Sequence, residues 1–276
     1  MPEGPEIHLA ADMVGEAIAG AVAQQLFFAF DALKPYQAKL SGRIVAGVRA
    51  RGKAMLIGFD NGLTIFSHNQ LYGQWVVRDA LDFPETNRQL RLAIHTDRKS
   101  ALLYSASDIA VLRDDELKDH PYLKRLGPDV LDPTVTTAQV LGQFHRPGFQ
   151  RRRLSGLLLD QQFLAGLGNY LRSEILFVAR VAPTLRPADC SPEQLRRLAE
   201  AALALARQSY RTRGITNSPE LAEALRRQGV SRSEYRFWVF NRQAEPCRVC
   251  ATPIQKETLG GRRLYYCPSC QTFTQI

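Results

Sequence analysis

The sequence lacks any apolar run as long as the roughly 18 residues that a membrane-spanning helix needs. It also lacks the basic-then-apolar order of a secretion signal, because it opens with Met-Pro-Glu-Gly-Pro-Glu. Internal repeats and low-complexity tracts are absent as well. These absences argue against a membrane-spanning or secreted protein, and we expect a protein of the bacterial cytoplasm.

Cysteine is scarce, with 5 residues in 276, yet four of them form one pattern. Cys247 and Cys250 make one CxxC pair, and after sixteen intervening residues Cys267 and Cys270 make a second pair. This spacing is typical of a zinc site with four thiolate ligands at about 2.3 Å. Two disulfides are the alternative, which a chain without a secretion signal disfavours. The sequence therefore predicts one structural Zn²⁺, since four thiolates leave no open position for water. Cys190 stands apart from this pattern.

The charge of the chain is unevenly distributed. Residues 1–133 contain 15 Lys+Arg and 17 Asp+Glu, whereas residues 134–276 contain 21 and 10 and so account for the net charge of +9. In this second half 20 of the 21 basic residues are arginine. Such asymmetry favours a polyanionic partner, because neutralised phosphates release counterions. The alternative is an arginine-rich composition inherited from a GC-rich genome.

The first half of the chain has the pattern of a β-sandwich with an attached helix. Apolar residues at helical spacing predict a helix over residues 5–20, which Gly20 can end. Short strand signals follow, and Asn61-Gly62 predicts a tight hairpin between two of them. The predicted strands are Arg43–Arg49, Ala54–Phe59, Leu63–Ser67, Gln74–Arg78, Leu90–Thr96 and Ala101–Ser105.

The second half is helical. A cluster of proline and glycine residues over 120–134 marks the boundary. The predicted helices are Thr137–Phe144, Leu154–Leu164, Tyr170–Ala179, Glu193–Tyr210 and Glu220–Gln228. The helix after Ser191-Pro192 has the N-cap, first-turn proline and capping-box Gln194 of a strong start signal. We predict a catalytic domain over 1–125, a hinge over 126–134, a helical domain over 135–240 and a zinc finger over 241–276.

Residues 2–6 could carry chemistry. Removal of the initiator Met would leave Pro2 with a free secondary amine, which condenses with an aldehyde carbon to a cationic iminium. A helix N-terminus just after the amine would disfavour its protonated form and make it nucleophilic. Glu3 and Glu6 lie beside it. The alternative is that both acids simply complement the dipole of the first helical turn, as in many helices.

Three motifs together resemble one family. The opening Pro2-Glu3-Gly4-Pro5-Glu6, the segment Asp160–Tyr170 (DQQFLAGLGNY) and the terminal zinc ribbon are similar to formamidopyrimidine-DNA glycosylase/endonuclease VIII, in the family's order. The middle segment resembles the family's helix–two-turn–helix motif. The likeness covers essentially the whole chain. It implies a bifunctional DNA glycosylase/AP lyase of base excision repair.

The resemblance implies roles for the residues that match. Pro2 would attack C1′ of the damaged nucleotide, displace the base and form a Schiff base. Glu3 would be the general acid on the deoxyribose, and Glu6 matches a second acid that supports the site. Lys53 matches a lysine that contacts phosphate and assists elimination. By itself, Lys53 would be taken for a solvated strand lysine.

The family's phosphate contacts match two further places. Asn169 matches the motif asparagine that binds backbone phosphate, where Gly166 and Gly168 would let the turn approach DNA. An ordinary glycine-rich turn between helices is the alternative. Arg262 matches the ribbon arginine that reaches the phosphates at the lesion, although the neighbouring Arg263 leaves that choice open. The arginines at 151–153 are a third possibility, or a solvated charge run.

Base removal requires the nucleotide to leave the stack, and a wedge must fill the gap. Gln70, Leu71 and Tyr72 are the candidate wedge, since an amide can pair with the orphaned base and the other two can replace lost stacking. A β-turn that buries Leu71 and Tyr72 is the alternative. The triplet resembles the endonuclease VIII branch of the family. Residues 212–240 match that branch least well and should border the lesion pocket.

The resulting expectation is an α+β protein. It combines an N-terminal β-sandwich with a flanking helix, a hinge, a helical domain with a helix–two-turn–helix motif and a zinc-ribbon hairpin. The expected partner is double-stranded DNA that carries oxidised bases or abasic sites, held in the cleft between the two domains. We expect a monomer that excises oxidised pyrimidines such as thymine glycol and nicks the strand by β,δ-elimination. The rivals are a glycosylase of the same family for 8-oxoguanine and formamidopyrimidines, and a non-catalytic zinc-ribbon DNA-binding protein.

Overall fold

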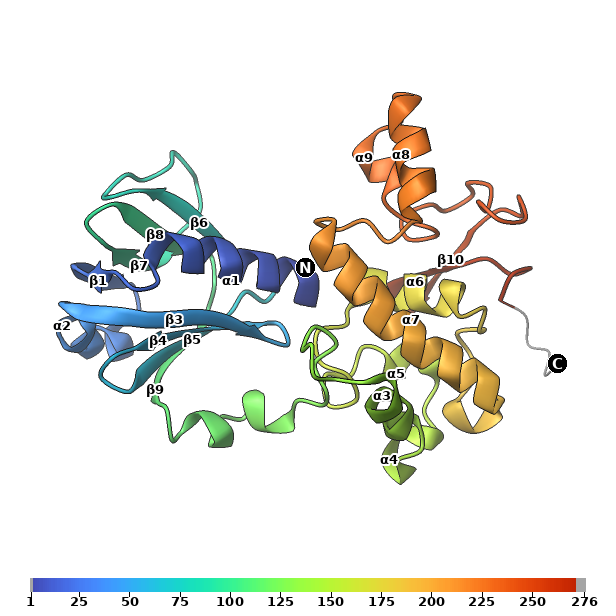
Figure 1. Ribbon diagram of the computed structural model, residues 1–276, viewed down its shortest axis with the longest axis horizontal. Helices are drawn as coiled ribbons and strands as arrows, with labels where there is room; N and C mark the ends of the chain where they lie inside the picture. Colours follow the sequence, from blue (N-terminus) through green and yellow to red (C-terminus); the bar gives the residue numbers. More distant parts are fainter. Residues whose placement is uncertain (1, 272–276) are drawn as a thin grey trace. The chain divides into compact units, whose positions relative to one another are not determined.

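The structure is a computed structural model of the chain and describes residues 2–271. The chain divides into two compact units (Figure 1). Of the described residues, 2 and 6–125 belong to unit 1, and 3–5 and 126–271 belong to unit 2. Within the described part of the chain no helix is both long and apolar enough to cross a bilayer.

Unit 1 is a β-sandwich with a helix packed into it, as expected. Its elements are α1 (Gly4–Ile18), β1 (Val22–Ala23), β2 (Gln25–Phe28), η1 (Asp31–Leu33), α2 (Pro35–Leu40), β3 (Arg43–Arg51), β4 (Ala54–Phe59), β5 (Leu63–His68), β6 (Gln74–Asp79), β7 (Leu90–His95), β8 (Lys99–Tyr104), β9 (Asp108–Arg113), η2 (Leu117–Asp119) and η3 (Leu123–Arg125). The strands form two antiparallel sheets, ordered β1-β3-β4-β5-β9 and β2-β7-β8-β6.

The core of unit 1 lies between the two sheets. It combines Val14 and Ile18 of α1 with Ile57 and Ile65 of one sheet and Ile94 of the other, and all five side chains are fully buried. The Asn61-Gly62 hairpin joins β4 and β5 as predicted, with Gly62 at φ +75°. Gly20 likewise follows α1 at φ +77°, the left-handed conformation that ends many helices. The predicted boundaries of this helix are therefore right to within two residues.

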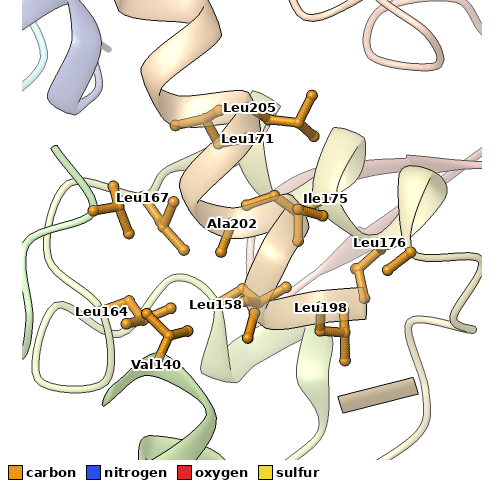
Figure 2. Close-up of a cluster of buried hydrophobic side chains, with 14 of the residues drawn as sticks. Val140, Leu158, Leu164, Leu167, Leu171, Ile175, Leu176, Leu198, Ala202 and Leu205 are labelled. Atoms are coloured by element: carbon orange, nitrogen blue, oxygen red, sulfur yellow. The ribbon is translucent and has the colours of Figure 1, made fainter. Parts of the chain in front are cut away.

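Unit 2 packs helices around one apolar core and ends in a β-hairpin. Its elements are α3 (Thr137–Phe144), α4 (Pro147–Gln150), α5 (Leu154–Leu157), α6 (Asn169–Val178), η4 (Pro187–Asp189), α7 (Pro192–Arg211), α8 (Pro219–Arg227), α9 (Arg232–Tyr235), β10 (Gln255–Leu259) and β11 (Arg262–Tyr266). Figure 2 shows the core where α6 meets α7, with Leu171 and Ile175 beside Leu198, Ala202 and Leu205. The capping box predicted for α7 is present, with Ser191 accepting the N–H of Gln194.

The predicted helix over Leu154–Leu164 is wrong, because α5 ends at Leu157. Side chains bond the backbone beyond that point and replace the helical hydrogen bonds. Asp160 Oδ1 accepts the N–H of Gln162 at 2.8 Å. The Gln161 carboxamide donates to the carbonyls of Leu159 and Leu167 and accepts the N–H of Gly166. The sequence 158–168 is thus a turn organised by its own polar side chains.

Candidate active site and nucleic-acid interface

Glu3 is built into the start of α6. Its carboxylate accepts the backbone N–H of Tyr170 at 2.7 Å and that of Leu171 at 3.3 Å. The N-cap residue of α6 is Gly168, which has no side chain to cap the helix. Glu3, with 2% exposure, therefore supplies the negative charge that a helix N-terminus favours.

Glycine allows the N-terminal segment to approach the turn before α6 closely. A Cβ at Gly168 would lie 2.3 Å from Cδ of Glu3. Gly166 has φ +94°, and its carbonyl accepts the N–H of Gly4 at 2.7 Å. We expected these glycines to admit DNA. The structure places the chain's own N-terminal segment against them.

Asn169, the first residue of α6, is half-buried and tied to Arg172. Its Oδ1 accepts from Arg172 Nη2 at 2.6 Å, so its Nδ2 is the group left to donate to a phosphate. Arg172 is 1% exposed and also donates to the carbonyls of Ser155 and Arg263. It thereby holds α5, α6 and the β-hairpin together.

Arg172 is a charged group that the sequence analysis missed. Burial, and then the neighbouring positive charge of Arg262, lower the pKa of Arg172 to about 10, while Glu3 acts in the opposite direction. Its Nε is buried without a hydrogen-bond partner in the described chain. A guanidinium at this depth strengthens the positive potential of the surface above it.

The turn of the β-hairpin presents Arg262. Gly260 and Gly261 both have positive φ, +56° and +73°, the pattern of a type I′ turn between paired Leu259 and Arg262. Arg262 is exposed and lines a pocket of about 620 Å³ together with Arg152, Arg153 and Arg172. Arg263 is exposed too, but it contributes its carbonyl to Arg172 and does not line this pocket. The geometry thus favours Arg262 as the phosphate ligand.

The four paired cysteines converge on one point, as predicted. Their sulfur atoms lie within 4.8 Å of one another, with 3.5 Å between Cys250 and Cys267 and 3.9 Å between Cys247 and Cys270. Tetrahedral Zn–S bonds of about 2.3 Å require sulfur separations of about 3.8 Å. Backbone N–H groups of Val249 and of Cys270 also point at ligand sulfurs, which stabilises thiolates. The donor set fits one structural Zn²⁺ and leaves no position for a substrate.

Lys53 lies in a tight turn of unit 1. Arg51 pairs with Ala54, so Gly52 and Lys53 form a two-residue hairpin turn, with Gly52 at φ +60°. The backbone N–H of Lys53 donates to the Tyr122 hydroxyl at 2.9 Å. The residue is only 4% exposed, so the interpretation as a solvated strand lysine is wrong.

The candidate wedge stands at the tip of the loop after β5. Leu71 and Tyr72 are 56% and 69% exposed, which excludes the alternative of a turn that buries them. Gln70 is exposed and has φ +50°. The loop closes through the Gly73 N–H, which donates to the Asn69 carbonyl at 2.7 Å. A Cβ at position 73 would lie 2.6 Å from the Asn69 backbone, so glycine is required there.

Pro2 and Glu6 flank the start of α1. Pro2 precedes the helix by two residues and is half-buried. Glu6 lies in its first turn and is half-buried as well. In the sequence, Pro2 directly precedes Glu3.

Residues 212–240, which the sequence could not assign, are organised by a buried acid on α6. The Glu174 carboxylate accepts the N–H groups of Trp238, Val239 and Phe240 and the hydroxyl of Thr216. Burial raises the pKa of Glu174, and these four hydrogen bonds oppose that effect. The signal that could have revealed Glu174 and Arg172 is their place amid the apolar residues of one short helix.

Comparison with known proteins agrees with this fold and site. Residues 1–107 match the formamidopyrimidine-DNA glycosylase N-terminal domain, residues 126–219 match the formamidopyrimidine-DNA glycosylase H2TH domain, and residues 244–272 match the zinc finger found in FPG and IleRS. The chain is 47% identical to Endonuclease 8 of Salmonella arizonae and 48% identical to that of Klebsiella pneumoniae. Each comparison covers 98% of this chain and 100% of the relative.

Solved structures share the fold. A complex of Lactococcus lactis Fpg (MutM) with DNA that contains an oxidised pyrimidine has a TM-score of 0.81 at 19% identity, over 98% of this chain and 99% of that one. The complex of Lactococcus lactis Fpg with abasic-site DNA has a TM-score of 0.80 at 18% identity, over 98% and 99% of the chains.

A β-sandwich, a glycine-rich turn between helices and a four-cysteine ribbon in this order define a base-excision DNA glycosylase/AP lyase. Within that class the chain belongs to the endonuclease 8 family. It is therefore an enzyme of DNA repair that acts on DNA, and the alternative of a non-catalytic DNA-binding protein is wrong.

Proposed function

We propose that the enzyme excises oxidised pyrimidines, thymine glycol among them, from double-stranded DNA and then cleaves the strand by β,δ-elimination. The observation that carries this substrate class is the exposed tip at Gln70, Leu71 and Tyr72. An amide can pair with the base left opposite the lesion, and a leucine with a tyrosine can replace the stacking that is lost. The identity of 47–48% to Endonuclease 8 proteins supports the same branch.

Pro2 is the proposed nucleophile. Once the initiator Met is removed, its secondary amine attacks C1′ of the damaged nucleotide and the bond from C1′ to the base breaks. The departing base takes up the proton that the amine nitrogen loses when it bonds to C1′. Loss of the ring oxygen from C1′ then gives an iminium, which withdraws electrons and makes the following eliminations possible. The phosphates on both sides leave in turn, so that a one-nucleotide gap with phosphate at both ends remains.

Glu3 is the proposed proton carrier. The two N–H donors at the start of α6 hold its carboxylate in place. As a carboxylate, it accepts the proton that the Pro2 amine must lose before attack. It then returns this proton to the ring oxygen of the deoxyribose as the ring opens. Glu6, in the first turn of α1, supports the site from the same segment.

Three groups are proposed to hold phosphates. Lys53 contacts the phosphate that leaves and assists elimination. Asn169 donates through Nδ2, and Arg262 donates from the hairpin turn that the zinc site stabilises. Charge-assisted contacts of this kind position the strand without reading its sequence. We further propose that the enzyme acts as a monomer in the bacterial cytoplasm, in keeping with its bacterial relatives.

Borohydride trapping tests the proposal. The enzyme, verified by mass spectrometry to begin at Pro2, is incubated with a duplex that contains one thymine glycol, and borohydride reduces any Schiff base to a stable crosslink. We expect a crosslink whose peptide maps to Pro2. A crosslink that forms with 8-oxoguanine but not with thymine glycol would overturn the pyrimidine assignment, and one that maps to a lysine would overturn the nucleophile.

A further inference from the structure

At one end of the five-stranded sheet, His68 lies close in sequence or in strand pairing to both the candidate wedge residue Gln70 and the candidate elimination residue Lys53. His68 is the last residue of β5, and it pairs with Ala54 of β4 on one side and with Asp108 of β9 on the other. Lys53 directly precedes Ala54, and Gln70 follows His68 by two residues. None of the proposed chemical steps uses the imidazole of His68.

The imidazole holds the backbone of the wedge. His68 Nδ1 accepts the N–H of Gln70 at 3.1 Å. This contact fixes the amide of a residue at φ +50°, a conformation that non-glycine residues adopt at a cost. The side chain of Gln70 is held separately, because its Oε1 accepts the Ser107 hydroxyl at 2.6 Å. The carboxamide must leave Ser107 to enter DNA, whereas the contact to Nδ1 can persist.

The same imidazole packs against the residue that fixes Lys53. The rings of His68 and Tyr122 lie 5.1 Å apart at 61°, an edge contact. The Tyr122 hydroxyl accepts the N–H of Lys53. Tyr122 is itself backed by Phe66, with ring centroids 5.8 Å apart, and Phe66 also contacts His120. One ring therefore touches both the loop that would enter the DNA and the support of the lysine turn.

We propose that His68 is a positioning residue that couples insertion of Gln70 into the DNA to the placement of Lys53. The proposal rests on the function proposed above for those two residues. His68 does not touch the substrate in this scheme. It acts through the N–H of Gln70 on one side and through the ring of Tyr122 on the other.

The coupling requires His68 in its neutral form, because a protonated Nδ1 cannot accept a hydrogen bond. Burial lowers the pKa of His68 from its ordinary 6.5, and the positive charge of Lys53 acts in the same direction. Asp108, across the β5–β9 pair, acts in the opposite direction. Tyr122 and His120 are the other titratable groups of this cluster, and burial lowers the pKa of His120 as well.

Two substitutions at position 68 separate positioning from packing. Asn at position i accepts the N–H of residue i+2 in an Asx turn, so His68→Asn keeps the acceptor without a group that titrates. His68→Leu fills space and removes the acceptor. The readout is the rise in fluorescence of 2-aminopurine placed opposite the lesion, which reports opening of the stack before any bond breaks.

We expect His68→Leu to slow insertion about tenfold, the effect of one lost neutral hydrogen bond, and His68→Asn to stay within about threefold of wild type. We also expect insertion by the wild type to weaken as the pH falls through the lowered pKa of His68, and insertion by His68→Asn to show no such loss in acid. Tyr122→Phe keeps the ring contact and loses the bond to Lys53, so insertion should be unchanged and elimination on abasic DNA slower.

The outcomes distinguish this proposal from the one on which it rests. If Gln70→Ala does not slow insertion, the wedge assignment is wrong and the coupling falls with it. If Gln70→Ala slows insertion but His68→Leu does not, the wedge assignment stands and only the role of His68 is overturned. Equal loss in His68→Asn and His68→Leu would assign His68 a packing role only. Should the Leu variant fail to fold, identical pH profiles for wild type and His68→Asn would still overturn the proposal.

Discussion

The carboxylate of Glu3 accepts the N–H of Tyr170 at 2.7 Å across 167 residues of sequence. The N-terminus of α6 thus binds an anion from the chain itself at the place where the sequence alone suggested DNA phosphate. This contact joins the residue next to the proposed nucleophile to the helix–two-turn–helix segment. It makes the geometry of the N-terminal segment depend on the turn at 166–168.

We predict that Gly168→Ala impairs catalysis far more than folding. The new Cβ would lie 2.3 Å from Cδ of Glu3, which is the end of a flexible side chain and can move aside. Displacement of the carboxylate by about 1 Å should lower single-turnover excision roughly 100-fold. Gly142→Ala in α3 is the matched control, since a Cβ there meets nothing within 4 Å. That variant should be fully active and no less stable in a thermal melt; equal activity of the two variants would contradict the prediction.

We predict that Glu3→Gln separates base removal from strand cleavage. The carboxamide can still accept one of the two N–H groups of α6, but it cannot carry the proton that ring opening requires. Excision of thymine glycol should fall by about 100-fold or more, the usual contribution of a general acid or base. Cleavage of a preformed abasic site should fall less, because the base is already gone and part of the sugar is open. Single-turnover assays on the two substrates give the comparison, and equal losses would argue against this role.

The sequence predicted the elements whose signals are local. The strands of β4, β5, β6 and β8 have six residues each, and α7 begins at an explicit capping box, so composition and spacing suffice for them. β1 and β2, with two and four residues, are too short to show a period. β9 has only Val111 buried, and its signal was missed for that reason.

The residues of the candidate site also divide into those that a local sequence pattern predicts and those that it does not. The zinc ligands follow from a spacing that encodes the geometry of one metal ion, and the structure brings the four sulfur atoms together. Lys53 could be named only through the family likeness, and the same likeness was needed to prefer catalysis at Pro2 over an ordinary helix start. Arg172 and Glu174 were missed, because their partners lie in segments up to 91 residues away and no local pattern connects them.

We predict that loss of zinc removes DNA binding and leaves unit 1 folded. Burial raises the pKa of the Cys267 and Cys270 thiols, so these two ligands need the ion to stay deprotonated near neutral pH. Protons compete for the sulfur atoms as the pH falls, and zinc should therefore dissociate more readily in acid. Cys267→Ser should hold less than one equivalent of zinc by mass spectrometry and lose affinity for DNA, since Arg262 lies on the hairpin. Cys190→Ser, outside the cluster, should keep a full equivalent. Retention of tight binding without zinc would refute the structural role.

We predict that Glu174→Gln loosens residues 237–240 and destabilises the protein in a pH-dependent way. Both carboxylate oxygens accept backbone N–H groups, and the amide nitrogen of Gln would point at one of these donors. The cost should be about 1–3 kcal/mol, that of one unsatisfied buried group. Because burial raises the folded-state pKa above its ordinary 4.5, the wild type gains stability as the pH falls through that pKa and loses it as the pH rises. The stability gap between wild type and variant should therefore be widest near pH 4 and narrow toward neutrality in urea unfolding.

Glu220→Gln, at an exposed position of α8, is the control and should change stability by no more than about 0.5 kcal/mol at either pH. A gap that widens with rising pH would show that the hydrogen bonds, and not burial, dominate the ionisation of Glu174.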